Sequence, residues 1–141
     1  MQPRAGKALT IVLPTTLCLT AAALVLNFWL GMRIGKLRMV HKISVGDGGN
    51  EAILRRMRAQ ANFHEAVPLT LILFGLVEAA GRGGVWLAPL GAVFLLGRIA
   101  HAFGMESDSG FRAGRPIGMV TGMIAQLTLT VFAVLISLGK A

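Results

Sequence analysis

The chain has 141 residues, of which 55% are hydrophobic and only 14% are charged, and its formal net charge at pH 7 is +8. The length allows one domain, and the composition is too apolar for an ordinary water-soluble domain of this size. The basic residues are not interleaved with the aromatic side chains that single-strand binders stack on bases, so we assign the charge to membrane topology and anionic lipid headgroups, not to nucleic acid.

The first apolar run covers residues 8 to 31 and is long enough to cross a bilayer without help from its neighbours. Arg4 and Lys7 precede it, and small residues lie in its middle, a pattern that signal peptides share. The run stays apolar to its end and is followed at once by a basic cluster. This continuation favours a retained first span over a cleaved leader.

The single cysteine, Cys18, lies inside this first span. One cysteine cannot close an internal disulfide, and no zinc-ligand spacing accompanies it. We therefore expect Cys18 to be a buried structural thiol, and we expect no metal site in the chain.

Basic residues are divided unequally between the two sides of the predicted membrane. Nine lie in the first and third loops: Arg33, Lys36, Arg38, Lys42, Arg55, Arg56, Arg58, Arg112 and Arg115. The opposite side holds Arg4, Lys7, Arg82 and Lys140. By the positive-inside rule, the first and third loops are cytoplasmic and both termini lie outside the cytoplasm. Within the first loop, the glycines of VGDGGN at 45–50 indicate a turn or linker, because the Lys and Ser or Thr of a phosphate loop do not follow.

The second and third spans are too short if only their apolar runs are counted. They reach membrane length as spans of about 59–80 and 85–105, and the tight AGRGG turn at 80–84 makes them an antiparallel hairpin. This extension brings polar residues into or near the membrane: Asn62, His64, Glu65, Arg98 and His101. Glu78, near the outer end of the second span, is predicted to be an interfacial residue.

The fourth span covers about 116–139, with Pro116 in its first turn. Small residues recur four apart, a spacing that lets membrane helices approach closely within a chain or between chains. They are Gly114, Gly118 and Gly122, and again Gly31 and Gly35. The sequence thus predicts an all-α integral membrane protein in which residues 1–141 form a single four-transmembrane-helix bundle.

Polar residues form a stripe on each of the two middle spans. On the second span the stripe has spacing i, i+4, i+7 and consists of Arg58, Asn62 and Glu65. On the third span the spacing is i, i+3, i+7, through Arg98, His101 and Met105. His64 is adjacent to the first stripe and off it, so it is expected to face a loop or headgroups.

The two stripes are predicted to lie at one depth. With the hairpin turn centred near Arg82, Glu65 is almost level with Arg98, and a Glu65–Arg98 ion pair would offset the cost of burying the carboxylate. Arg115 reaches the same membrane edge from the fourth span. Such a pair either pins the bundle together or belongs to an anion-binding cavity, and the residues alone leave both interpretations open.

Three segments resemble a known family of membrane proteins. They are RAQANFHEAVPL at 58–69, LLGRIAHAFGM at 95–105 and RPIGMVTGM at 115–123. Together they resemble the membrane-associated proteins in eicosanoid and glutathione metabolism (MAPEG), which include the microsomal glutathione transferases. The similarity covers most of the chain from the second span onward, and the absence of extra domains resembles the bacterial branch.

The resemblance implies a homotrimer of four-helix protomers in the bacterial inner membrane. Glutathione, as co-substrate, would lie between neighbouring subunits near the cytoplasmic face. By analogy its charged ends are held by residues of the second span and its binding network is supported from the third; these residues are Arg58, Asn62, Glu65, Arg98 and His101. Arg115 takes the place of the arginine that stabilises the thiolate. The other substrate would be a hydrophobic electrophile or a lipid hydroperoxide that partitions into membrane lipids.

The chain departs from the family at its aromatic positions. It has no tyrosine, and Ala66, His101 and Met105 stand where relatives that handle glutathione place tyrosines. His101 can donate one hydrogen bond in place of a phenol, whereas the other two cannot. The alternative to a transferase or peroxidase is therefore a non-catalytic member that binds lipid or another small anion. Cation efflux is disfavoured, because arginines beside Glu65 would repel a cation.

Overall fold

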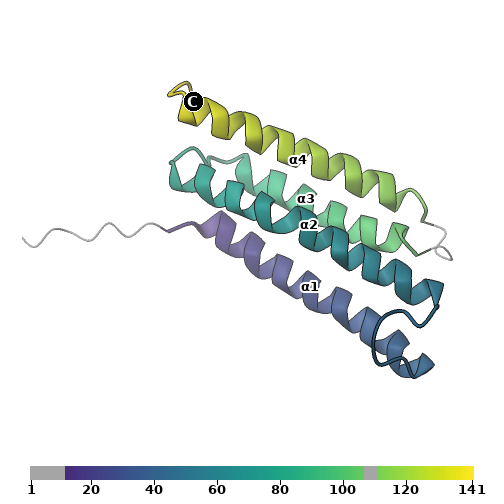
Figure 1. Cartoon of the computed structure of the whole chain (residues 1–141). Helices are drawn as coiled ribbons and strands as arrows, with labels where there is room; N and C mark the ends of the chain where they lie inside the picture. The colour runs from purple at the N-terminus through teal and green to yellow at the C-terminus, as the bar shows by residue number, and fades with distance from the viewer. Residues whose placement is uncertain (1–11, 107–110) are drawn as a thin grey trace, which may run out of the picture.

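The computed structural model describes residues 12–106 and 111–141, and these form four helices. The helices are α1 (Pro14–His41), α2 (Glu51–Ala79), α3 (Leu87–Gly104) and α4 (Gly114–Ser137). They lie side by side, with successive helices running in opposite directions and α1 at one edge of the bundle (Figure 1). Three of them, α1, α3 and α4, are long and apolar enough to cross a membrane. The predicted all-helical class is confirmed, and α2 carries the polar stripe that lowers its mean hydropathy.

Two helices extend beyond the apolar runs that the sequence marked as spans. Helix α1 continues past residue 31 to His41, and α2 begins at Glu51, before residue 59. Asn50 caps α2, since its side-chain oxygen accepts a hydrogen bond from the Ile53 amide at 3.1 Å, and Glu51 adds negative charge to the first turn. Much of the basic cluster assigned to the first loop is therefore helical. Residues 8–11 of the first predicted span, with Arg4 and Lys7, lie outside the described residues.

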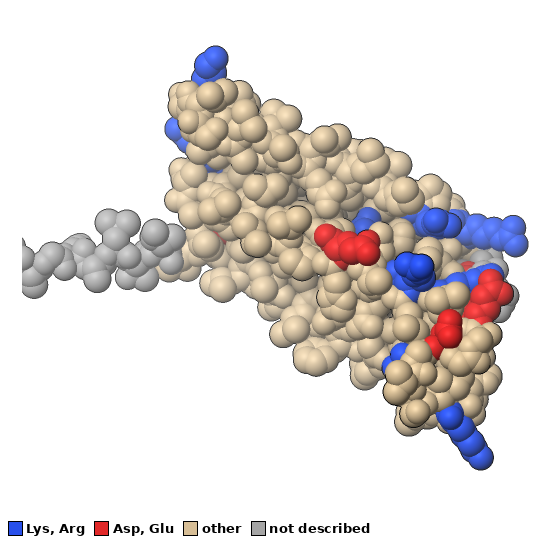
Figure 2. Space-filling view, viewed as in Figure 1, with Lys and Arg blue, Asp and Glu red and all other residues tan. Residues whose placement is uncertain are grey.

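The segment between α1 and α2 is a turn built on glycines, as predicted. Gly46, Gly48 and Gly49 have positive φ angles, which glycine adopts without steric cost. Arg38, near the end of α1, donates from Nε to the Gly46 carbonyl at 3.0 Å and holds the turn against the helix. We call this end of the bundle, where α1 ends and α2 begins, the loop end. On the face shown in Figure 2, most charged side chains lie toward this end, and one acidic patch lies nearer the middle of the bundle.

Close packing of α3 against α4 depends on the predicted glycine series. Gly114, Gly118 and Gly122 are all buried on α4. A Cβ at Gly118 would lie 2.5 Å from the His101 Cβ, so only glycine permits this approach. The helix-packing prediction is confirmed for these three residues. It is wrong within this chain for Gly35, where a Cβ would meet nothing within 4 Å.

An ion-pair cluster ties three helices together at the loop end. Glu106, just after α3, accepts from Arg33 of α1 and from Arg56 of α2, with the Arg56 Nε at 2.7 Å. The Arg33 guanidinium also lies over the rings of Trp29 and Phe103, at 4.4 and 5.1 Å from their centroids. Charge pairing and cation–π contacts therefore fix α1 beside α2 and α3.

Cys18 is exposed, so the prediction that it is buried is wrong. It lines an apolar groove of about 580 Å³ between α1 and α3, with Leu19 and Leu95 among its neighbours. On a helix that is long and apolar enough to cross a membrane, an outward-facing apolar side chain meets lipid, not water, and its exposure carries no hydrophobic cost.

Candidate functional site: a polar cavity at the loop end

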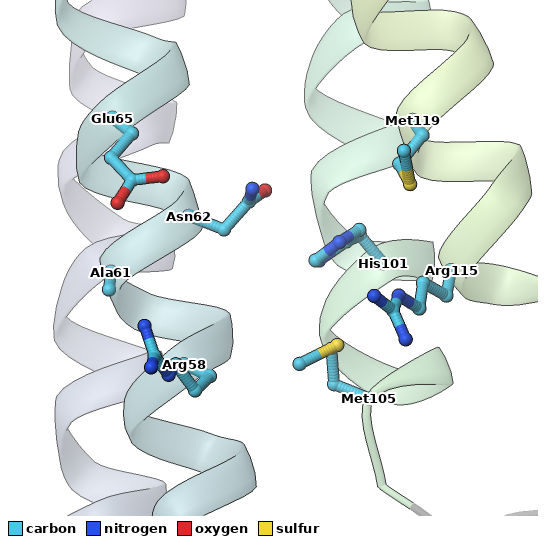
Figure 3. A pocket seen from close by; sticks show the side chains of 8 residues that line it. All are labelled: Arg58, Ala61, Asn62, Glu65, His101, Met105, Arg115 and Met119. Carbon is cyan, nitrogen blue, oxygen red and sulfur yellow. The ribbon is translucent and has the colours of Figure 1, made fainter.

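A cavity of about 410 Å³ opens at the loop end, with α2 on one side and α3 and α4 on the other (Figure 3). Its lining comprises Arg58, Ala61, Asn62, Glu65, His101, Met105, Arg115 and Met119. Five of the six residues that the sequence selects for a site lie in this one cavity. The helical spacing explains the wall on α2, because i, i+4 and i+7 share a face.

Three charged side chains of the cavity are exposed and engage no other described residue. Arg58 and Glu65 lie on the α2 wall, and Arg115 lies on the α4 wall opposite (Figure 3). Within the part of the chain that the structure describes, none of the three has a hydrogen bond or an ion pair. Their donors and acceptors are therefore available to a ligand, whereas His101 is buried, at 5% exposure, in the wall that α3 contributes.

The predicted Glu65–Arg98 pair is wrong. Arg98 is 7% exposed and donates from Nη1 to the Asn62 side-chain oxygen at 2.9 Å, and from Nη2 to the Gly118 carbonyl. Neutral oxygens thus satisfy part of the guanidinium, and Glu65 keeps its solvation. This arrangement avoids the desolvation of a second charge that a buried ion pair would require. Arg98 positions Asn62 from behind the cavity and does not line it.

A second, smaller cavity of about 160 Å³ adjoins the first, with Asn62 and Met119 in both linings. It contains Arg98 and also Gln126, a residue that our sequence reasoning missed. Gln126 donates to the Thr70 hydroxyl at 3.1 Å, which joins α4 to α2. The signal was present, because Gln126 follows Gly122 by four residues and continues the buried face of α4.

The opposite side of α2 carries a further groove, of about 430 Å³, between α1 and α2. Arg38, Gln60 and His64 line it, and Ala61 belongs to both this groove and the loop-end cavity. His64 is exposed and lies outside the loop-end cavity, in agreement with its place off the stripe. Among residues 12–106 and 111–141, no group of three or more His, Cys, Asp or Glu side chains could hold a metal ion.

The fold and the cavity define a helical integral membrane protein with an arginine-lined polar site at one end of the bundle. The MAPEG family model matches residues 16–135, and the chain belongs to this family. The family resemblance of the three sequence segments is thereby confirmed.

Two curated relatives are similar to half of the chain. Both are called inner membrane protein YecN, one from Escherichia coli strain K12 and one from Escherichia coli O6:H1 strain CFT073. Each is 31% identical over 72 residues, which cover 50% of this chain and 54% of the relative. The match therefore spans about half the length of these relatives. No solved structure matches the chain.

Proposed function

We propose that this chain is a glutathione-dependent transferase or peroxidase of the bacterial inner membrane, acting on hydrophobic electrophiles or lipid hydroperoxides. One observation carries the proposal: Arg58, Glu65 and Arg115 lie in one cavity and have no partner among the described residues. Family membership supports the same chemistry, and the relatives named as inner membrane proteins support the location.

The charges of the cavity complement those of glutathione. The tripeptide carries carboxylates, one ammonium group and a thiol, and the cavity offers Arg58 to a carboxylate, Glu65 to the ammonium group and Arg115 to the thiol. Arginine forks bind carboxylates through two parallel hydrogen bonds, and Glu65 is the acceptor for the ammonium group. Asn62, held by Arg98, supplies a fixed amide beside the peptide backbone of the ligand. A volume of about 410 Å³ lies within the usual range for small-molecule sites.

Arg115 is the residue we assign to the sulfur. A guanidinium beside the thiol favours the thiolate, which is the nucleophile. When the thiolate adds to an electrophile, a carbon–sulfur bond forms and the adduct takes up a proton. In reduction of a hydroperoxide, two glutathione molecules become the disulfide while the hydroperoxide becomes an alcohol and water. The electrophile arrives from lipid, past the apolar side chains Met105 and Met119 of the cavity.

The assembly we propose is a homotrimer in which α2 is a fourth span and the loop end faces the cytoplasm. The basic residues at the loop end support this orientation through the positive-inside rule. The side of α2 that bears Arg58 and Glu65 is exposed in the single chain. A neighbouring subunit would cover it and shield the bound tripeptide from lipid, which a single protomer does not do.

The second candidate is a non-catalytic family member that uses the same cavity for lipid or another small anion. The observation that favours it is the absence of tyrosine from the whole chain. Ala66 and Met105 offer no hydroxyl to a thiolate, and His101 is buried in the cavity wall.

The test is calorimetric titration of the purified protein in detergent with glutathione. We expect binding by the unaltered chain and its loss in Arg58→Ala. Arg55→Ala is the matched control, because it removes the same charge from the same helix outside the cavity, where Arg55 pairs with Glu51. Equal losses in both variants would show a general charge effect, not a site. The absence of binding at millimolar glutathione would exclude thiol chemistry, and binding without turnover of any electrophile or hydroperoxide would favour the second candidate.

A further inference from the structure

Arg98 is a buried cation without a carboxylate partner among the described residues. Its guanidinium stays charged in proteins and carries five N–H donors, of which the Asn62 oxygen and the Gly118 carbonyl engage two. The Nε atom is buried and has no hydrogen-bond partner in the part of the chain that the structure describes. The ion pairs of that part all involve other arginines. A charge inside a membrane helix is costly unless an opposite charge meets it, so this cation calls for an anion that the described chain does not supply.

The accessible part of the guanidinium is the edge formed by Nε and Nη2. One face is taken by the ring of Phe94, whose centroid lies 5.7 Å from Cζ. The edge faces α4 at Gly122, where a Cβ would lie 2.7 Å from Nη2 and 4.0 Å from Nε. Glycine at position 122 therefore leaves a notch beside the charge that any other residue would fill.

The small cavity of about 160 Å³ lies at this notch. Its lining consists of Asn62, Ala66, Arg98, Met119, Gly122, Met123 and Gln126. Asn62 and Met119 also line the loop-end cavity, so the two spaces adjoin. A small ion can therefore pass from the charged loop end to Arg98 without crossing the hydrocarbon of the bilayer.

The polar groups around the small cavity are mainly hydrogen-bond donors. The Asn62 oxygen accepts from Arg98, which leaves the two hydrogens of the Asn62 amide. The Gln126 amide nitrogen donates one hydrogen bond to Thr70 and has a second hydrogen to offer. Arg98 adds the unpartnered Nε–H group. Three side chains from three helices thus present donors to one space, as an anion requires.

Charge and size select the class of anion. Arg98 is the one charged residue in the lining of the small cavity, so a divalent anion would keep a buried charge without compensation. The volume is below the usual range for organic ligands and holds an inorganic ion. Met119 and Met123 contribute polarizable thioethers, which suit a weakly hydrated, polarizable ion.

We infer that the small cavity binds a chloride ion, which is the counter-ion of Arg98 within the bundle. Asn62 and Gln126 donate to the ion from the two neighbouring helices. This site is distinct from the proposed glutathione site, because Arg58, Glu65 and Arg115 do not line it. The inference holds whether or not the chain binds glutathione.

The experiment is equilibrium binding of chloride to the purified full chain in detergent, read from the broadening of the chloride NMR signal. Gluconate, which is too large for the cavity, replaces chloride at constant ionic strength. We expect chloride to broaden and bromide to restore the narrow line, with sulfate at least about tenfold less effective than bromide. A line as narrow as that of empty detergent would overturn the inference. Equal competition by sulfate would also overturn it, because a solvated basic surface would then be the site.

A second readout is thermal unfolding, since an ion that binds only the folded chain stabilises it. The unfolding temperature should rise with chloride at constant ionic strength in the unaltered chain. In Arg98→Gln, which keeps a polar side chain and removes the charge, we expect chloride to change neither the temperature nor the line width. Chloride binding retained in this variant would overturn the assignment to Arg98.

Gly122→Ala keeps the site falsifiable if Arg98→Gln does not fold. The added Cβ meets only the Arg98 side chain, so it fills the notch without a backbone clash. We expect chloride affinity to fall about tenfold, the effect of losing one strong contact. Gly35→Ala is the matched control, because a Cβ there meets nothing within 4 Å. Unchanged affinity in Gly122→Ala, or an equal loss in Gly35→Ala, would contradict the site.

A last arm separates this site from the loop-end cavity. Chloride binding should be the same in Arg58→Ala as in the unaltered chain, because Arg58 lines only the larger space. Loss of chloride binding in this variant would place the ion in the loop-end cavity and overturn the inference. Failure of glutathione to bind would count against the proposed function alone.

Discussion

Two carboxylates of α2, one in the middle of the helix and one near its C-terminal end, have opposite surroundings. Glu78 accepts hydrogen bonds from the amides of Thr15 and Thr16 at 2.9 and 2.8 Å and from the Thr16 hydroxyl at 2.7 Å. It thereby holds the first turn of α1, where the helix dipole favours negative charge. Glu65 engages no other described residue and lines the loop-end cavity. A carboxylate whose oxygens are satisfied within the chain stabilises the bundle, whereas one that is left open is available to a ligand.

Arg115→Ala tests the loop-end cavity, whose charged groups are available to a ligand, and it has the largest expected effect. The residue lies on the wall opposite Glu65 (Figure 3), and we propose that it stabilises the thiolate. Loss of one such electrostatic contact typically lowers kcat about 100-fold or more. The measurement is turnover of an electrophile with glutathione, together with thermal unfolding in detergent. Unaltered turnover in a folded variant would exclude Arg115 from catalysis.

Glu78→Gln tests the carboxylate whose oxygens are hydrogen-bonded within the chain. An amide offers one oxygen in place of two and brings an N–H group toward the Thr15 and Thr16 amides. We expect the free energy of unfolding to fall by about 2 kcal/mol, the range for a helix cap and charged hydrogen bonds. Glutathione affinity should be unchanged, because Glu78 lies outside the cavity. Unfolding in mixed detergent measures the first quantity and calorimetry the second.

Glu65→Gln makes the same substitution as Glu78→Gln on the same helix and is its matched counterpart. We expect glutathione affinity to fall about tenfold, or about 1.4 kcal/mol, since the acceptor for the ammonium group loses its charge. Stability should stay within about 0.5 kcal/mol, as for an exposed surface substitution. A large loss of stability would mean that Glu65 has a structural partner in the assembled protein and would break the contrast with Glu78.

The smallest expected effect is the coupling between the two sites. Glu65 and Glu78 are about 20 Å apart along the helix at 1.5 Å per residue, and they share no partner. The stability changes of the two single variants should therefore add within about 0.5 kcal/mol in the double variant. A larger coupling would show that occupation of the loop-end cavity depends on how α1 is anchored.

Helical periodicity predicted which side chains share a cavity, but it did not predict which of them interact with one another. The i, i+4, i+7 spacing on α2 and the neighbouring stripe on α3 predicted a shared site, and the structure brings Arg58, Asn62, Glu65 and His101 into one cavity. Their binding roles stay predictions. The predicted Glu65–Arg98 pair was wrong because the position of a residue along the hairpin gives its depth in the membrane but not the direction of its side chain. The Asn62 side chain and the Gly118 carbonyl are the groups that accept from the Arg98 guanidinium.

Glu78 shows the same limit in a different way. Its position predicted an interfacial residue, which is a statement about depth alone. The partner is the start of α1, more than sixty positions away in the sequence, and no local pattern encodes that contact. Gln126 was missed because its only signal is its place four residues after Gly122, and that spacing does not name its partner, Thr70 of α2.

The sequence by itself determined the helical membrane class, the glycine face that packs α4 on α3, and most of the polar residues that line the loop-end cavity. Each of these follows from hydrophobicity or from the 3.6-residue period, which are local properties of the chain. The tertiary structure alone decided which polar groups are satisfied and which are open. That choice depends on distances between helices, which set the competition between carboxylates and neutral oxygens for each buried donor.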